Sequence, residues 1–400
     1  MNLLLLIILR TGGLLYIDNT MYIDSIRCII VYLTLWIALI IYLSIVITTI
    51  TKVYNLIIIT SMLVFTLKSN IIFFLTFESL ALIIIGTVII KGSYEDRFKA
   101  RLYFILYTSL TIMPIFLLFM KAWVNGLTTH YIINSTCQNI IGISSILVLG
   151  FLVKIPIYPF HLWLIKTHLE APVEGSIILA GLLLKLGTYG LIRFRSLWIN
   201  TSIITIILPF TFTGALIISL NCLYSQDYKL LVANSSIVHI NICLFSCVKI
   251  TEHAITTRLI TIVRHGLTSS GLFNIRNIIY KNTNRRRFLI NKGLLASIPY
   301  ISMWLFILLI TNIAVPPRIN MMSEIRTLTI ITSISYTFII PVILFCFVAG
   351  LYSIYYFYMV INGNTLNYNI NLENIININL IQFMHIIPLF TFIFWGSIIY

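Results

Sequence analysis

The sequence predicts an all-α polytopic membrane protein with about twelve transmembrane helices, each long enough to cross a hydrocarbon layer. The first observation is composition: 60% of the 400 residues are hydrophobic, 9% are charged, and the mean hydropathy is +1.03. A soluble domain carries about a quarter charged residues, so this chain lacks the charge for an aqueous surface. The second is that apolar runs of about 18 or more residues recur along nearly the whole chain. The third is that no barrel-like alternation is present, so helices must satisfy the backbone inside lipid.

The apolar runs between polar breaks predict where the helices lie. Residues 1–17 are apolar but short, and they predict a re-entrant or partial segment. The run over residues 293–335 is long enough for a broken pair of helices. The predicted spans are residues 28–51, 53–68, 71–90, 101–120, 141–165, 174–195, 198–222, 229–248, 255–278, 293–335, 336–361 and 375–399.

Paired prolines interrupt two of these runs, at Lys154-Ile-Pro156-Ile-Tyr-Pro159 and at Ala314-Val-Pro316-Pro317. Proline removes a backbone donor and clashes with the preceding turn. Two broken helices at corresponding positions of two halves indicate an inverted-repeat transporter. We therefore expect four segments: an amino-terminal segment with a first helix (1–52), a first repeat (53–195), a second repeat (198–361) and a carboxy-terminal helix (362–400).

The net charge of +15, from 26 Lys and Arg against 11 Asp and Glu, raises the possibility of a nucleic-acid partner. The basic residues argue against nucleic acid, because most lie in short connections between apolar runs, as topology determinants do. The connections 91–101 and 276–292 are the most basic, and an even number of spans separates them. Both are therefore expected on the same side of the membrane, the matrix or cytoplasmic side.

Six cysteines show no metal-ligand spacing, and we expect small buried hydrophobes rather than a metal site. His161 and His168 are seven residues apart and could share a helix face, but a zinc site needs further ligands in register, and the sequence shows none.

Ionisable residues within or beside the apolar spans are the candidate functional groups. A carboxylate at membrane depth costs about 2.5–3.5 kcal/mol on insertion scales. Taken singly, a membrane histidine can be a helix-to-helix hydrogen bond and a lysine can extend to the interface. Several such groups on successive helices favour a proton relay instead. The candidates are Glu78, Lys154, Lys185, His239, His265 and Glu324.

These residue types suit proton transfer, because removal from water disfavours the charged form of both a carboxylate and an amine. A Glu–Lys pair that forms and separates can then change the proton affinity of its neighbours, which arginine cannot do because it stays protonated. Glu78 is predicted to hold Lys154 in its charged form, and loss of that negative charge would help Lys154 pass its proton onward.

Long motifs resemble the antiporter-like membrane-arm subunits of respiratory complex I, and among them the chain 4 family of mitochondrial NADH-ubiquinone oxidoreductase. The resemblance runs from about residue 20 to the end of the chain. It is carried by Phe151-Leu-Val-Lys-Ile-Pro, His161-Leu-Trp-Leu, Lys-Thr-His168-Leu-Glu-Ala-Pro-Val, Leu-Leu-Lys185-Leu-Gly, Glu95-Asp-Arg-Phe-Lys-Ala, Gln226-Asp-Tyr-Lys-Leu-Leu-Val-Ala-Asn-Ser-Ser-Ile-Val-His239, His265-Gly-Leu-Thr-Ser-Ser and Val315-Pro-Pro-Arg-Ile-Asn-Met-Met-Ser-Glu324.

The resemblance implies a role for each candidate. Glu78 and Lys154 would be the first pair, Lys185 the central relay, His239 and His265 the link, and Glu324 the terminal site. It also places His161 and His168 in a hydrated region near Lys154. The chain would then be a proton-translocating subunit of an NADH:ubiquinone reductase, driven by electron transfer in other subunits, with no redox chemistry of its own.

The same resemblance implies a multi-pass protein of the mitochondrial inner membrane. It implies no cofactor in this chain, with NADH, flavin, iron–sulfur clusters and ubiquinone bound by other subunits. Its partners would be other membrane-arm subunits, especially antiporter-like chains 2 and 5, and lipids such as cardiolipin. Three positions depart from the family pattern, because Ile165 stands where proline is common, Glu174 where a small residue is common and Ser323 where glycine is common. The amino-terminal part is also shorter than the two leading helices usual in the family.

Two alternatives remain open at this point. One is a stand-alone cation/proton antiporter of the related multi-subunit type, which sodium-dependent transport would reveal. The other is a static scaffold whose buried charges are only structural, in which case Lys185→Ala would leave proton pumping unchanged. A quinone-binding role is disfavoured, because an isoprenoid tunnel needs no such series of charges.

Overall fold

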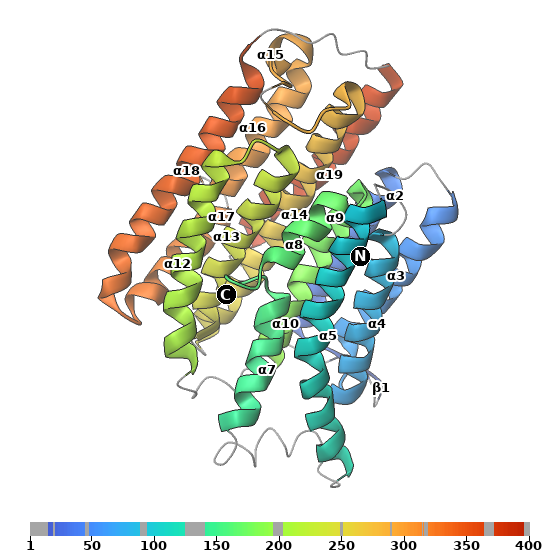
Figure 1. Ribbon diagram of the computed structural model, residues 1–400, viewed down its shortest axis with the longest axis vertical. Coiled ribbons are helices and arrows are strands. Elements are labelled where there is room, and N and C mark those ends of the chain that lie inside the picture. Colours follow the sequence, from blue (N-terminus) through green and yellow to red (C-terminus); the bar gives the residue numbers. More distant parts are fainter. Residues whose placement is uncertain are drawn as a thin grey trace.

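A computed structural model describes residues 15–18, 21–44, 48–88, 94–124, 141–194, 203–248, 251–288, 290–313, 315, 319–363 and 372–395. These residues form a bundle of helices with one short β-hairpin (Figure 1). Five helices among them are long and apolar enough to cross a membrane, and several shorter apolar helices lie beside them. The predicted class, a helical membrane protein, is confirmed.

The first part of the bundle contains the hairpin and the helices up to Arg193. Its elements are β1 (Leu15–Asp18), β2 (Met21–Ile23), α2 (Ser25–Ser44), α3 (Thr48–Thr66), α4 (Asn70–Val88), α5 (Tyr94–Val124), α7 (Ile141–Lys154), α8 (Leu162–Glu170), α9 (Val173–Ile178), a π-helical turn (Leu179–Leu183) and α10 (Leu184–Arg193).

The second part contains the long helix α14, which runs through the centre of the bundle in Figure 1. Its elements are α12 (Ile203–Tyr224), α13 (Tyr228–Val248), α14 (Glu252–Thr283), α15 (Leu294–Ser297), α16 (Pro299–Ile313), α17 (Ile319–Thr332), a 3₁₀ turn (Tyr336–Phe338), α18 (Ile339–Ile361) and α19 (Leu372–Trp395).

The predicted span 141–165 is divided where the prolines predict a break. Helix α7 ends at Lys154 and α8 begins at Leu162, with Pro156 and Pro159 in the irregular segment between them. The Trp163 indole Nε1 donates to the Val153 carbonyl at 3.0 Å, so a side chain satisfies one group that the break leaves unpaired. At the second predicted break, α16 ends at Ile313 and α17 begins at Ile319, whereas Pro316 and Pro317 lie outside the described residues.

The segment predicted as re-entrant is described only at its end. Residues 1–14 lie outside the described part of the chain, and Leu15–Asp18 pair with Met21–Ile23 as an antiparallel hairpin. A β-bridge between Met21 and Leu67 joins the hairpin to the connection after α3. The Tyr-Ile sequence that occurs in both strands suits extended backbone better than helix, because aromatic and β-branched residues favour strands.

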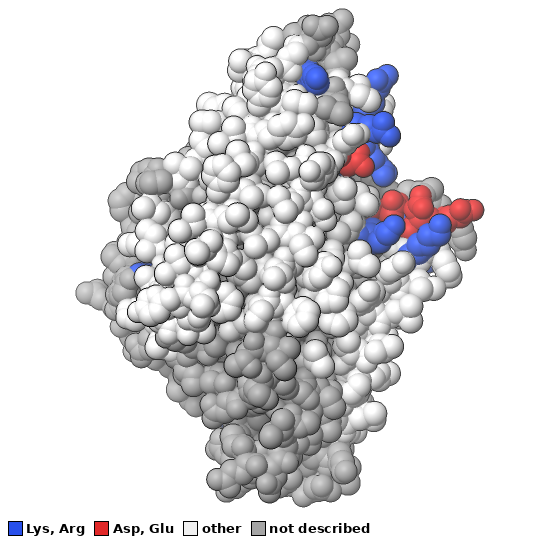
Figure 2. All heavy atoms as spheres, turned by 60° about the vertical axis from the view of Figure 1, so that its left-hand side comes forward, with Lys and Arg blue, Asp and Glu red and all other residues white. Residues whose placement is uncertain are grey.

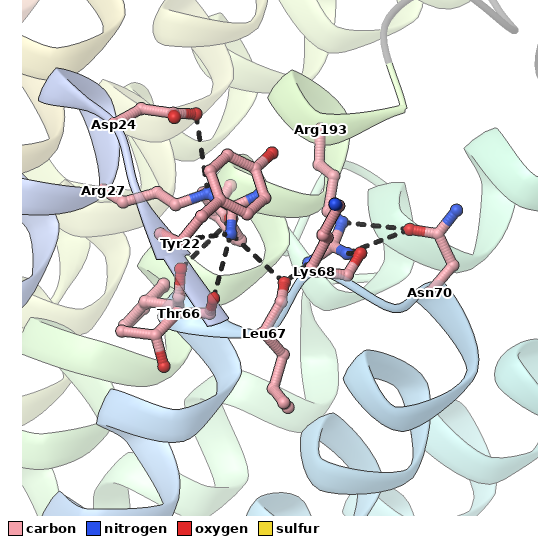
Figure 3. Close-up of polar contacts among 10 residues, drawn as sticks. Tyr22, Asp24, Arg27, Thr66, Leu67, Lys68, Asn70 and Arg193 are labelled. Atoms are coloured by element: carbon pink, nitrogen blue, oxygen red, sulfur yellow. Dashed lines mark hydrogen bonds and ion pairs between the residues drawn. The ribbon is translucent and has the colours of Figure 1, made fainter. Parts of the chain in front are cut away.

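Two arginines cap the carboxyl end of α3 beside this hairpin (Figure 3). Arg27 Nη1 donates to the carbonyls of Thr66 and Leu67, at 3.2 Å each. Arg193 donates to the Leu67 and Lys68 carbonyls at 2.8 and 2.6 Å, and to Asn70 Oδ1. The last carbonyls of a helix lack partners within the helix, and cations near them are favourable. Helices α2, α3 and α10 are thereby joined at one end of the bundle.

The surface of the bundle is largely apolar. Large hydrophobic side chains point outward, as in α5, where Leu110 is 70% exposed, and in α18, where Ile340 is 77% exposed. In Figure 2 most of the charged side chains that are drawn gather at the upper right of the view, and the broad white face carries few of them. Such a face suits hydrocarbon, since soluble monomers rarely expose large contiguous apolar patches.

Candidate functional site

The first pair of candidate groups joins α4 to the end of α7. Lys154 Nζ lies 3.0 Å from Glu78 Oε1 and 3.9 Å from the centre of the Phe77 ring. The lysine side chain is 3% exposed, and the Glu78 side chain is 31% exposed. Lys154 is the last residue of α7, where the proline break frees carbonyl groups, so its cation also lies at the favourable end of the helix dipole.

The next group is Lys185, and the helix around it is locally irregular. Lys185 Nζ donates to the Ala180 carbonyl at 2.7 Å and lies 2.9 Å from Nδ1 of His265 on α14. Ala180 belongs to the π-helical turn that directly precedes α10. Such turns occur frequently at functional sites, because the wider turn redirects backbone groups. Because an ammonium can only donate, His265 Nδ1 accepts here and the ring proton belongs on Nε2.

Helices α10 and α7 approach each other closely between Lys185 and the Glu78–Lys154 pair. Gly187 on α10 faces the backbone just where α7 ends. A Cβ at this position would lie 2.7 Å from Ile155 Cγ1, 3.2 Å from Ile155 N and 3.3 Å from the carbonyl carbon of Lys154. Glycine therefore allows α10, which carries Lys185, to pack directly against the break that carries Lys154.

His239 on α13 continues the series beyond His265. The two imidazole rings have their centres 6.2 Å apart, and His239 Nε2 lies 3.4 Å from the Tyr352 hydroxyl of α18. Both histidines are buried. A phenol and two imidazoles in this order are groups that can each give and accept a hydrogen bond.

The last acidic candidate, Glu324 on α17, is paired with a residue that the sequence did not single out. Arg264 Nη1 lies 2.8 Å from Glu324 Oε1, with the arginine side chain 7% exposed and the glutamate side chain 23% exposed. A signal for Arg264 was present, because it stands beside His265 in the apolar run Leu-Ile-Thr-Ile-Val-Arg-His. A buried arginine in such a run needs an acid or backbone carbonyls to pair with.

Two small cavities lie along the path from Lys185 to Glu324. One, of about 10 Å³, is lined by residues that include Lys185, His239 and His265, and the other, of about 20 Å³, by residues that include His239 and Glu324. Arg264 also lines both. Each volume corresponds to roughly one water-sized sphere, and the polar lining can bind water. Thr188, Cys243, Thr261, Thr327 and Cys346 complete the polar part of the two linings.

The two histidines near the first break occupy different surroundings. His161 directly precedes α8 and stacks on Tyr158 with ring centres 5.5 Å apart. His168 is fully buried and stacks on Phe273 of α14 at 4.7 Å, and neither of its ring nitrogens has a hydrogen-bond partner within the described segments. His161 therefore lies close to the Lys154 break, whereas His168 faces α14. Their participation in a hydrated region stays a prediction.

Other buried polar groups were missed in the sequence. Lys229 on α13 donates to the Leu169 and Ala171 carbonyls at 3.0 and 2.6 Å and so caps the end of α8. His385 on α19 lies 3.1 Å from the Ser270 hydroxyl of α14. His385 stands in a mainly apolar stretch of the sequence, which was the available signal, whereas Lys229 directly follows the polar segment Ser-Gln-Asp-Tyr. Within the described ranges, no group of three or more His, Cys, Asp or Glu side chains is placed to hold a metal ion.

The chain matches known proteins over most of its length. Residues 68–351 match the family described as NADH:quinone oxidoreductase/Mrp antiporter, transmembrane. The NADH-ubiquinone oxidoreductase chain 4 of Rhipicephalus sanguineus is 35% identical over 330 residues, which are 81% of this chain and 75% of the relative. That of Mytilus edulis is 30% identical over 399 residues, which are 96% of this chain and 91% of the relative.

Solved structures agree with this assignment at the level of the fold. A chain of respiratory complex I from Thermus thermophilus superposes with a TM-score of 0.79 at 17% identity, covering 97% of this chain and 87% of that one. A chain of the archaeal membrane-bound sulfane sulfur reductase superposes with a TM-score of 0.80 at 18% identity, covering 94% of this chain and 67% of that one. By its sequence matches and its fold, the chain belongs to the NADH-ubiquinone oxidoreductase chain 4 family of antiporter-like membrane subunits.

Proposed function

We propose that this chain is a proton-translocating membrane-arm subunit of NADH:ubiquinone oxidoreductase. The observation that supports the proposal most is the file of ionisable residues inside the bundle, which crosses six helices and consists of Glu78–Lys154, Lys185–His265, His239 and Glu324. Ionisable groups inside a membrane are costly and mark proton relays. Lys185 and His265 in direct contact are the centre of the file, because an amine and an imidazole there can exchange one proton.

In this mechanism the Glu78–Lys154 pair controls the charge next to Lys185. While the pair is closed, Glu78 compensates the Lys154 ammonium. When it opens, the uncompensated charge on Lys154 repels an ammonium at Lys185. Lys185 then gives its proton to His265 Nδ1, which forms an N–H bond while Lys185 becomes a neutral amine. His239, together with water that the two cavities can hold, would carry the proton onward to the Glu324 carboxylate.

The proposal extends to the arrangement of the chain and its assembly. Residues 53–195 and 198–361 would be two inverted repeats, each with one broken helix, flanked by residues 1–52 and 362–400. The chain would lie in the mitochondrial inner membrane, beside other membrane-arm subunits such as antiporter-like chains 2 and 5 and with lipids such as cardiolipin. NADH, flavin, iron–sulfur clusters and ubiquinone would be bound by other subunits, whose electron transfer drives the opening of the first pair.

The decisive experiment uses the complete complex in sealed vesicles and compares Lys185→Met with the exposed-lysine control Lys99→Met. We expect Lys185→Met to assemble and to lose a large part of the protons pumped per NADH oxidised, whereas the control pumps normally. Normal pumping by an assembled Lys185→Met complex would favour the static scaffold and reject the relay. A requirement for sodium in the wild-type complex would instead favour a cation/proton antiporter.

A further inference from the structure

The position of Arg264 suggests a function that the relay alone does not require. Arg264 and His265 are successive residues of α14, so their side chains leave the helix about 100° apart. His265 points to Lys185, and Arg264 points to Glu324 on α17. One turn of α14 therefore connects the central lysine to the terminal acid.

Arg264 also lies beside the proposed proton path from His265 to Glu324. It lines both the cavity that contains Lys185 and the cavity that contains Glu324. His239 is the other ionisable residue that lines both, and it lies on α13. A proton that leaves His265 for Glu324 by way of these cavities therefore passes directly beside the guanidinium.

Arginine differs from every other member of the file, because it keeps its charge at all ordinary pH values. It cannot carry the proton, but its fixed charge repels an excess proton nearby. While Glu324 is ionised and bound to Arg264, the two charges compensate each other. A proton that binds Glu324 forms an O–H bond and removes the negative charge that faces the guanidinium, so the ion pair is lost.

We propose that Arg264 is a positioning residue that acts as an electrostatic valve between the two cavities, holding Glu324 as a carboxylate until the Arg264–Glu324 pair opens. The inference rests on the relay proposed above and adds a barrier to it. A proton reaches Glu324 only when the guanidinium moves to other acceptors, so transfer and pair opening occur together. The closed pair at 2.8 Å is the state that blocks passive flow.

The test measures two quantities in vesicles that contain the complete complex. The first is passive proton conductance with electron transfer inhibited, and the second is the number of protons pumped per NADH. Arg264→Met is expected to raise the passive conductance several-fold and to lower the pumping ratio. Arg264→Lys keeps the charge and is expected to restore both values to near those of the wild type.

Arg258 provides a matched control on the same helix. It is 1% exposed, its Nε donates to the Ser246 carbonyl at 2.7 Å, and it is not among the residues that line either cavity. Arg258→Met removes a similarly buried arginine and is expected to leave the passive conductance unchanged.

A double variant, Arg264→Met with Glu324→Gln, also removes the terminal proton carrier. Its passive conductance should be lower than that of Arg264→Met alone.

The outcomes separate the valve from the relay. If Lys185→Met pumps normally, the relay itself is rejected. If Lys185→Met loses pumping but Arg264→Met shows wild-type conductance and pumping, only the valve is rejected. Should Arg264→Met fail to assemble, Arg264→Gln, which can still hydrogen-bond to Glu324 but carries no charge, replaces it. The valve predicts the same several-fold rise in passive conductance, and wild-type conductance in an assembled Arg264→Gln complex would overturn it.

Discussion

Lys185 Nζ lies 2.9 Å from His265 Nδ1, so an amine and an imidazole from two different helices are in direct contact inside the bundle. Both residues are buried, and the lysine also donates to the Ala180 carbonyl at 2.7 Å. A lysine paired with a carboxylate would be held in its charged form. A lysine that faces a neutral imidazole and a carbonyl can release its proton without breaking an ion pair.

Lys185→Arg is expected to abolish the contribution of this chain to pumping although it preserves a positive charge. A guanidinium keeps its proton, so the step from residue 185 to His265 cannot occur. The measurement is the number of protons pumped per NADH in vesicles, with assembly checked on a native gel. Retention of the wild-type ratio by an assembled Lys185→Arg complex would show that this residue acts only as a fixed charge.

Glu78→Gln is expected to weaken the complex as well as its pumping. It leaves the buried Lys154 ammonium facing a neutral amide in place of the carboxylate, and the loss of one charged hydrogen bond costs about 1.5–3 kcal/mol. The double variant Glu78→Gln with Lys154→Met removes both charges and should recover thermal stability without recovering pumping. Equal melting temperatures for the single and double variants would contradict this account.

Gly187→Ala is expected to lower stability by about 1–3 kcal/mol, because its new methyl group would lie 2.7 Å from Ile155 Cγ1 and close to the backbone of the break. Gly86 on α4 is a matched control, since a Cβ there meets nothing within 4 Å. Gly86→Ala should therefore be neutral or stabilise by up to about 1 kcal/mol through helix propensity. Thermal unfolding of the purified complex in detergent compares the two. Equal melting temperatures would mean that α10 does not need its close approach to α7.

Arg193→Lys is expected to destabilise the end of the bundle at the hairpin. The guanidinium bonds the Leu67 carbonyl, the Lys68 carbonyl and Asn70 Oδ1 together, and a lysine cannot reproduce this planar geometry. Loss of one or two of these charged bonds costs about 1.5–3 kcal/mol each. Limited proteolysis near residue 68 reports the change, with Lys52→Gln as a control on the exposed side of α3. An unchanged cleavage rate in Arg193→Lys would exclude the capping role.

Much of the fold could be predicted from local signals. Apolar length indicates membrane helices, and the prolines at 156 and 159 predict the break after Lys154, because both effects depend on a few adjacent residues. Glu78, Lys154, Lys185 and Glu324 were visible as candidates for the same reason, since each is an ionisable residue in or next to an apolar run.

Features that depend on contacts between distant segments could not be predicted in this way. The partner of Glu324 is Arg264, 60 residues away, and only the packing of α14 against α17 brings them together. The hairpin at residues 15–23 is held partly by the bridge from Met21 to Leu67, which no local pattern reveals. The π-helical turn at Leu179–Leu183 has an ordinary helical composition, so composition gave no indication of it.

That turn has a consequence for which way the lysine faces. A π-helical turn accommodates one residue more than an α-helical turn, and each residue of an α-helix turns the chain by about 100°. If Leu179–Leu183 became α-helical with all of its residues kept, the extra residue would turn the following helix by about 100°, and Lys185 would rotate about a quarter of the way around the axis of α10. The ammonium would then face a neighbour other than His265, and the number of residues in one turn, rather than any change of side chain, would disconnect the two halves of the path.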